Sequence, residues 1–510
     1  MSAARWLLEL TIGGRVYRYA TDPVEVTTST GVVAYEPGLA DLSSSLDPTS
    51  RGITVLGTPA GGWAALDALW PLDSGTAVLR WHRDGETLSE ALTLIQGRLT
   101  SPRWGEVEEP LSATIQSATE TAGELAPEPA HKIDSTSWLS ITIPDASQGA
   151  QYPLILGYPG RRATGTSTCT PAKIASNPTP PTGQMLIADG HVHATAVSLM
   201  RLGSVYTVSQ CDVSHGTDLA GHPYSYIAES EIDPSLFDEG DEFWVGWAES
   251  GGGGVPRDDR SGALRGAGEI IRYLLRRYSS IPVDERRWRE HAQWLDQYLI
   301  DAYLDEPTDV WDWIARALLP ILPVRVRRGQ DGLWLQPIRW GATERDAVDY
   351  LVAGREIDRV GVVQARDEVY NAFALDYALV RGRYYSSRVL TAQSGVLRPG
   401  PAQPDARVIG DLLCRRSQER YGLQWAPPMQ TGVVHSSATA LRILRDQALQ
   451  YATRHRTARY VGGLNLARLE PGAIVHLTDA AVSLSGVAMV DDIELSVDEI
   501  ALDLVMLDGD

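Results

Sequence analysis

Short stretches of alternating apolar and polar residues, each ended by a glycine, proline or acidic turn, recur at both ends of this 510-residue chain. Near the start, residues 6–12 and 15–20 flank Gly13 and Gly14, which is typical of a β-hairpin with a tight turn. Further strands are predicted at residues 24–28, 32–35, 53–56, 76–82, 91–99 and 110–119, with a short helix at 63–70. Strands this short and this evenly spaced predict a sandwich or a barrel.

The end of the chain predicts a second β structure that follows a helix. Leu444 and Ala448 belong to an apolar series at helical spacing in residues 438–455, so one face of that helix is apolar. Short strands are expected next, at residues 460–466, 473–477, 487–495 and 500–507. Pro471 and Gly472 mark one turn between them, because proline sets one backbone angle and glycine accepts the left-handed one.

The middle of the chain differs from its ends in amino-acid composition. Nine prolines between Pro127 and Pro181 forbid long helices there and predict a loop-rich β module. The four glycines from Gly251 to Gly254 are interpreted as a flexible joint. Strands in the module are expected at residues 183–188, 191–198, 204–210 and 242–248.

Helices are predicted directly after the glycines. Their apolar residues recur at helical spacing in residues 266–278, 284–304 and 308–319. The third helix is expected to begin at Thr308 or Asp309 as its N-cap and to end at Pro320. A hairpin follows at residues 324–328 and 333–337, and strands return at 360–364, 370–381 and 384–391.

Length divides the chain into several units, because hydrophobic cores rarely grow beyond ~250 residues. The predicted fold class is mainly β with α insertions. We expect an N-terminal barrel (1–125), a loop-rich β module (126–260), a helical region with a hairpin (261–345), and a second barrel with one long helix (346–510). The second barrel is expected to combine strands around residues 360–391 with those of 460–507.

Composition argues against several kinds of protein. The formal net charge of −20 is unsuited to stable binding of nucleic-acid phosphates, which relies on clustered lysine and arginine. No stretch approaches the ~20 apolar residues of a membrane helix, and residues 1–10 lack the pattern of a signal peptide. Synthesis in the cytoplasm is therefore expected. The three cysteines are too few for a disulfide framework.

Possible metal ligands gather in one part of the loop-rich module, at Cys169, His191, His193, Cys211, His215 and His222. A His-x-His pair on one strand places both rings on the same face. Zinc and iron–sulfur ligands, however, usually include closely spaced cysteines, and these cysteines lie far apart. We therefore expect no metal, no cofactor and no catalytic residue, and a metal site around Cys169, His191, His193 and Cys211 stays open as an alternative.

Other candidate chemistry is weaker. The acidic pairs at residues 238–239 and 241–242 surround a glycine and are more typical of a solvated turn than of a calcium loop. The sequence contains no phosphate-binding loop, no G-x-S-x-G elbow and no H-E-x-x-H motif. These absences lower the expectation of an enzyme. They do not exclude an enzyme, because catalytic residues that are distant in sequence can lie together in the fold.

Several short sequence motifs resemble motifs in the tail-tip, or baseplate hub, proteins of long-tailed bacteriophages. The motifs lie at residues 31–39, 153–157, 269–275, 281, 311–314, 318–322, 331–337, 367–371, 417–422 and 469–479. The resemblance implies two tube-like β-barrels in each chain. It also implies a homotrimer, whose six barrels would form a ring that matches a hexameric tail tube above and a three-fold fibre or spike below.

In function, the resemblance implies a non-enzymatic structural protein of the virion, located at the tail tip. Its partners would be other copies of itself, the tail tube or distal tail protein, the central fibre or spike, and the tape-measure protein. An acidic wall would suit a channel through which DNA slides during ejection. Two alternatives stay open: a tail-associated enzyme that degrades peptidoglycan, and a carbohydrate-binding adhesin in which Trp244 and Trp247 meet a glycan.

Overall fold

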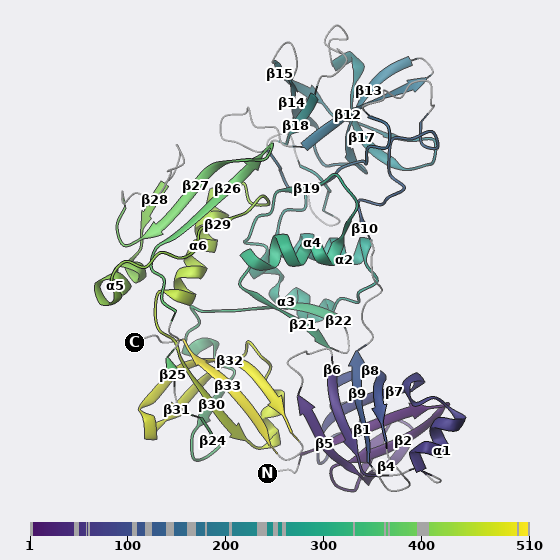
Figure 1. Ribbon diagram of the computed structural model, residues 1–510, viewed down its shortest axis with the longest axis vertical. Coiled ribbons are helices and arrows are strands. Elements are labelled where there is room, and N and C mark those ends of the chain that lie inside the picture. Colours follow the sequence, from purple (N-terminus) through teal and green to yellow (C-terminus); the bar gives the residue numbers. More distant parts are fainter. Residues whose placement is uncertain are drawn as a thin grey trace.

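The computed structural model is mainly β, with one group of helices near its centre and others at its edges, and this confirms the predicted fold class (Figure 1). The barrel-like sheets lie at one end of the molecule and the loop-rich β module lies at the other. The structure describes residues 4–44, 50–57, 59, 62–104, 110–117, 125–138, 147–160, 170–178, 181–202, 207–231, 242–247, 253–257, 262–329, 332–361, 364–365, 368–394, 407–496 and 499–507.

The first barrel is one curled sheet in the order β3-β4-β2-β1-β7-β8-β9-β6-β5, and its edge strand β5 returns to contact β1. Alternation along β1 buries Trp6, Leu8 and Leu10. Its elements are β1 (Ala4–Ile12), β2 (Arg15–Ala20), β3 (Val24–Thr28), β4 (Gly31–Pro37), β5 (Leu39–Ser44), β6 (Ser50–Val55), α1 (Gly62–Leu69), β7 (Thr76–Arg83), β8 (Leu92–Arg103) and β9 (Leu111–Ser117). The predicted Gly13-Gly14 hairpin turn is confirmed, and both glycines have positive φ.

The second barrel-like sheet has the order β23-β31-β32-β33-β30-β24, with β25 pairing beside β24 on β30. A bridge between Ala353 and Ile357 joins the end of the first strand to the start of the last, so the two edges of the sheet meet. Its strands are β23 (Asp349–Val352), β24 (Ile357–Arg359), β25 (Gln364–Ala365), β30 (Arg456–Gly462), β31 (Ile474–Asp479), β32 (Leu484–Leu495) and β33 (Ile500–Met506).

One strand assignment from the sequence is wrong. Strands β26 (Phe373–Val380) and β27 (Arg383–Thr391) do not enter the second barrel but form a separate sheet in the order β28-β27-β26-β29. Two helices accompany this sheet, where the sequence predicted one. Helix α6 packs on β26 and β27 and contacts α5, which also packs on β27. The additional elements are β28 (Arg407–Gly410), β29 (Met429–Gln430), α5 (Leu412–Tyr421) and α6 (Ser437–Tyr451). Alternation indicates a strand but cannot identify its partners, because those contacts are distant in sequence.

The loop-rich module contains a seven-stranded sheet in the order β15-β14-β18-β12-β13-β17-β16. Its strands are β12 (Thr170–Pro178), β13 (Pro181–Asp189), β14 (Ala196–Leu202), β15 (Thr207–Asp212), β16 (Ser214–Thr217), β17 (Pro223–Ala228) and β18 (Glu242–Gly246). The interpretation of the glycine run as a flexible joint is wrong for Gly253 and Gly254. Both are buried, and Gly254 lies so close to Ile155 that a Cβ atom would meet that residue's carbonyl oxygen at 2.0 Å.

The helical region is shorter than predicted in one place. Helix α3 ends at Leu295, and residues 302–304, which the sequence assigned to the same helix, form a strand that pairs with the module. The third helix begins as expected at Asp309, whose carboxylate accepts a hydrogen bond from the Asp312 amide at 2.8 Å. The elements are α2 (Ala267–Tyr278), α3 (Glu285–Leu295), α4 (Val310–Trp313), β10 (Leu125–Ala126), β11 (Leu154–Leu156), β19 (Ala302–Leu304), β20 (Thr308–Asp309), β21 (Val324–Gly329) and β22 (Gly332–Pro337).

Candidate functional site

The two barrel-like sheets lie side by side and share one apolar core (Figure 1). Buried residues of both sheets belong to a single cluster, and β5 of the first sheet contacts β32 of the second. The indole Nε1 of the fully buried Trp6 donates a hydrogen bond to the backbone oxygen of Ser496 at 3.0 Å. This contact joins residues from opposite ends of the chain, so the two sheets behave as one paired unit.

The hairpin of β21 and β22 lies against both barrels. Strand β21 contacts β8 of the first barrel, and Arg325 on β21 forms an ion pair with Asp491 on β32 of the second. Arg287 on α3 reaches Glu470 of the second barrel at 2.5 Å. These contacts hold the barrel pair in one orientation beneath the helical region.

Asp301 is the point at which three parts of the chain meet. Its carboxylate accepts two hydrogen bonds from the Arg265 guanidinium, at 2.7 Å and 2.9 Å, and a third from the backbone amide of Tyr158 at 2.9 Å. The backbone amide of Asp301 donates to Val433, beside the four-stranded sheet. The Asp301 side chain is fully buried, and the Arg265 guanidinium also lies 4.7 Å from the centre of the Tyr158 ring. A buried charge of this kind requires full pairing.

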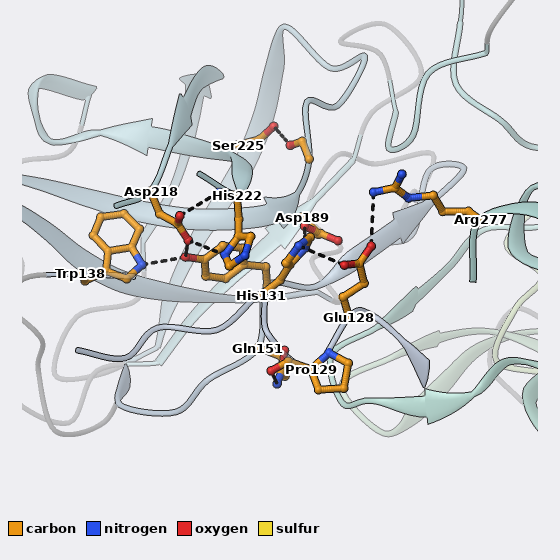
Figure 2. A network of polar contacts seen from close by, with 12 residues as sticks. Glu128, Pro129, His131, Trp138, Gln151, Asp189, Asp218, His222, Ser225 and Arg277 are labelled. Atoms are coloured by element: carbon orange, nitrogen blue, oxygen red, sulfur yellow. Dashed lines mark hydrogen bonds and ion pairs between the residues drawn. The ribbon is translucent and has the colours of Figure 1, made fainter. Parts of the chain in front are cut away.

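A polar network lies inside the loop-rich module and centres on two histidines (Figure 2). His131 Nδ1 lies 2.8 Å from Asp189 Oδ1, and His222 Nδ1 lies 3.1 Å from Asp218 Oδ2. The two imidazole rings are 4.3 Å apart, centre to centre. The Tyr152 hydroxyl donates to Asp218 at 2.7 Å. The network therefore joins the segment before β11 to β13 and to the turn before β17.

Glu128 extends this network to the helical region. Its carboxylate lies 3.4 Å from His131 Nε2 and accepts a hydrogen bond from Arg277 on α2 at 3.3 Å (Figure 2). Both ring nitrogens of His131 therefore face carboxylates. The hydrogen bond that His131 donates to Asp189 raises the pKa of the imidazole above its usual value, and burial opposes this shift. The arrangement favours an imidazolium held between acids, which is a structural rather than a nucleophilic role.

We expect His131 to make the protein's stability depend on pH. The pKa of His131 is higher in the folded state than its value of ~6.5 in the unfolded state. Protonated His131 therefore stabilises the fold fully at pH values below ~6.5, and this stabilisation is lost as pH rises through the pKa of the folded state. The free energy of unfolding that His131→Gln removes should therefore be larger at about pH 5.5 than at about pH 8.5. Urea unfolding of wild type and variant at both values measures the difference.

The matched control is His291→Gln on α3. Burial lowers the pKa of His291, and Arg339 lowers it further, so its protonation opposes folding as pH falls. The pH trend of this variant should have the opposite sign. An identical trend for both variants would mean that the Glu128, Asp189 and Asp218 carboxylates do not govern His131.

The histidines and cysteines singled out in the sequence do not converge. His191 and His215 lie with their ring centres 4.9 Å apart, but His193 Nε2 accepts a hydrogen bond from the Gly262 amide instead. Cys211 is buried, and burial raises the pKa of its thiol to about 11. No group of three or more potential metal ligands occurs in the described ranges. Cys169 lies outside the described residues.

The remaining candidate residues, which are the acidic pairs and two tryptophans, also do not form one site. Of the two acidic pairs, only Glu242 falls within the described residues. Trp247 is fully buried and donates to the Thr170 hydroxyl at 2.8 Å, so it cannot meet a glycan. Trp244 is half-buried and lines a cleft. Sequence analysis did not identify Asp301 or His131. A single acidic residue or histidine cannot be recognised as part of a buried ion pair until its partner, which is distant in sequence, is known.

Comparisons with known proteins give matches among solved structures alone. No protein-family model matches the sequence, and no curated protein matches it. The tail protein from Neisseria meningitidis MC58 matches with a TM-score of 0.40 and 10% identity, over 98% of this chain and 96% of that chain. The 43 kDa tail protein of prophage MuSo2 from Shewanella oneidensis matches with a TM-score of 0.35 and 10% identity, over 99% of both chains.

A chain from the virion of a native gene transfer agent particle also matches, with a TM-score of 0.39 and 14% identity, over 71% of this chain and 86% of that chain. The chain is similar to tail proteins. This is the class of protein that the sequence motifs resemble. Every one of these TM-scores is below 0.5.

Among the described residues, no helix is both long enough and apolar enough to cross a lipid bilayer.

Proposed function

We propose that this chain is a baseplate hub, a structural protein at the tip of a phage-like tail in the virion. Three copies would form a ring of six barrels that joins the tail tube or distal tail protein to a central fibre or spike. The ring would enclose part of the DNA ejection channel and contact the tape-measure protein. The observation that carries the proposal is the pair of barrel-like sheets that share one core.

A shared core supports ring formation because it presets the angle between neighbouring barrels. In a closed ring every barrel has two neighbours, and one of the two contacts is already built within each chain. The second contact must then join the free side of the first barrel to the free side of the second barrel in the next copy. Such a head-to-tail contact closes into a ring when the rotation is correct.

Both free sides carry exposed apolar residues. Helix α1 lies on the side of the first barrel that faces away from the second (Figure 1), and the neighbouring Leu69 and Trp70 are 72% and 51% exposed. At the far side of the second barrel, β23 pairs with β31, and Val348 and Tyr350 are 69% and 58% exposed. Exposed apolar residues at these places support contacts between copies.

The described chemistry favours a structural role over an enzymatic one. In the best-formed His–Asp pair, His131 with Asp189, the second imidazole nitrogen faces Glu128 and not a hydroxyl or thiol nucleophile. Burial raises the pKa of the Cys414 thiol to about 12, which keeps that cysteine unreactive. The net charge of −20 supports a channel wall to which DNA does not adhere.

Cysteine cross-linking tests the proposed ring. In a Cys169→Ser background, chains carrying Trp70→Cys together with Tyr350→Cys should form disulfide-linked dimers and trimers on mild oxidation, because these sides would meet between copies. Denaturing electrophoresis without reductant measures the products. The ladder should end at three chains.

The control for cross-linking carries Leu219→Cys, since Leu219 is 64% exposed but lies in the loop-rich module. It should remain uncross-linked. Monomers alone from the paired variant, or a ladder that continues well beyond three chains, would contradict the closed ring.

Location in the particle is tested separately. Electron microscopy of particles labelled with an antibody against this chain should show label at the distal end of the tail. Label on the capsid or along side fibres would contradict the tail-tip role, whatever the cross-linking result.

A further inference from the structure

A cleft of about 450 Å³ opens between the loop-rich module and the four-stranded sheet. One wall is β18 of the module, which contributes Glu242 and Trp244, and the floor includes Tyr303 of β19. The opposite wall is the turn between β26 and β27, with Arg381 and Arg383. Figure 1 shows the tip of this hairpin reaching the module beside β18. The cleft therefore depends on two parts of the chain that are distant in sequence.

Arg381 holds an unusual position at the cleft. Arg381 and Gly382 form the two-residue turn between β26 and β27, and their φ angles of +47° and +73° are those that such a hairpin turn requires. The Arg381 Nε atom is buried and has no hydrogen-bond partner among the residues that the structure describes. A buried donor without a partner is unfavourable, because the hydrogen bond to water that it has lost is not replaced. An oxygen of a ligand in the cleft would supply the partner that the Arg381 Nε atom lacks.

The other residues in the cleft have complementary properties. Trp244 and Tyr385 provide aromatic surface, and the Arg383 guanidinium lies 5.6 Å from the centre of the Tyr385 ring. The Trp244 indole Nε1 donates to the Glu242 carboxylate at 3.3 Å, which orients both side chains. Aromatic surface packs against the apolar faces of sugar rings, and a carboxylate accepts hydrogen bonds from hydroxyl groups.

We propose that this cleft binds an acidic saccharide, a sugar chain that carries carboxylate groups. The Arg381 and Arg383 guanidinium groups would bind the carboxylate of the saccharide, since arginine matches that planar group with two parallel hydrogen bonds. Trp244 would stack on a sugar ring, and the Glu242 carboxylate would accept hydrogen bonds from its hydroxyl groups. A nucleic acid carries a phosphate on every nucleotide, so the Glu242 carboxylate and the net charge of −20 repel it more strongly than a saccharide with a carboxylate on alternate sugars.

Binding to this cleft does not depend on the hub role, because the purified chain can be tested without assembled particles. Calorimetric titration should compare a hexasaccharide of alternating glucuronate and N-acetylglucosamine with chitohexaose, a neutral chain of N-acetylglucosamine. Hexasaccharides that contain galacturonate or sialate extend the acidic set. At least one acidic member should bind about tenfold more tightly than chitohexaose, the gain expected from one charge-assisted pair.

Variants locate the binding. Arg381→Gln and Trp244→Ala should each weaken binding of the acidic hexasaccharide about tenfold or more. Arg316→Gln and Val32→Ala are the controls, since the Arg316 side chain is 82% exposed on the helical region and Val32 is 63% exposed on the first barrel. Both controls should bind as wild type does. Unchanged thermal unfolding of all four variants confirms that they are folded.

Two results would overturn the proposal. The first is equal binding, or no binding at millimolar concentration, for every acidic hexasaccharide and chitohexaose. The second is full binding by folded Arg381→Gln and Trp244→Ala variants, which would place the saccharide elsewhere on the chain.

Discussion

Replacing Arg265 by methionine is expected to lower the free energy of unfolding by about 3–5 kcal/mol, one of the two largest effects of a single substitution foreseen for this chain. The Asp301 carboxylate is fully buried and receives two hydrogen bonds from the Arg265 guanidinium. Methionine fills similar space but leaves the carboxylate without its counter-charge. The loss should be large because the remaining buried charge has little solvent to stabilise it.

Urea unfolding of the whole chain measures this effect, and a double variant tests its cause. Arg265→Met with Asp301→Asn removes the charge while an amide oxygen still accepts the Tyr158 hydrogen bond, so it should recover a substantial part of the lost stability. Arg316→Met is the control. Its ion pair with Asp312 has side chains 82% and 57% exposed, and its loss should cost less than ~1 kcal/mol. A double variant no more stable than Arg265→Met would show that packing, not charge, dominates.

The second large effect is expected for Trp6→Ala, which should cost about 3–5 kcal/mol. Trp6 is fully buried in the core that the two barrels share, and its indole donates to Ser496 of the second barrel. Alanine would leave a cavity at the contact and remove the hydrogen bond. Because this contact sets the angle between the barrels, the variant should also assemble into rings less well than wild type.

Two further variants separate these contributions. Trp6→Phe keeps an aromatic ring but leaves the Ser496 carbonyl without its partner, so it should cost less than Trp6→Ala. Trp70→Ala, at a tryptophan 51% exposed, should have only a small effect on unfolding but should weaken contacts between copies. Light scattering measures the assembly and urea unfolding measures the stability. Normal assembly of a strongly destabilised Trp6→Ala chain would mean that the angle between barrels is set elsewhere.

Local patterns predicted much of the secondary structure. The Gly13-Gly14 turn, helix α6 and the hairpin of β21 and β22 were all predicted, because each depends on residues that are close in sequence. The predicted helix 284–304 was too long. Leu304 pairs with Leu154, and this long-range contact overrides the local helical spacing of the segment.

The candidate sites were less accessible to sequence reasoning. Trp244 was considered as a glycan contact, and the structure places it in the proposed cleft, but the Arg381 opposite it had no feature that set it apart from the other arginines. The histidine and cysteine group stayed open as an alternative metal site, although its cysteines lie far apart in the sequence. In the structure, His193 before β14 and Cys211 in β15 have other neighbours, and the described residues form no such cluster.

The sequence by itself determined the mainly β class, the turns, the helical centre and the acidic character of this protein, because these depend on local spacing and composition. Only the tertiary structure decided that strands β26 and β27 form a sheet outside the second barrel. It also decided that Trp6 joins the two barrels and that Arg265 pairs with Asp301. The physical reason is the same in each case. Burial of apolar surface and pairing of buried charge are settled between residues far apart in the chain, where sequence spacing carries no information about distance.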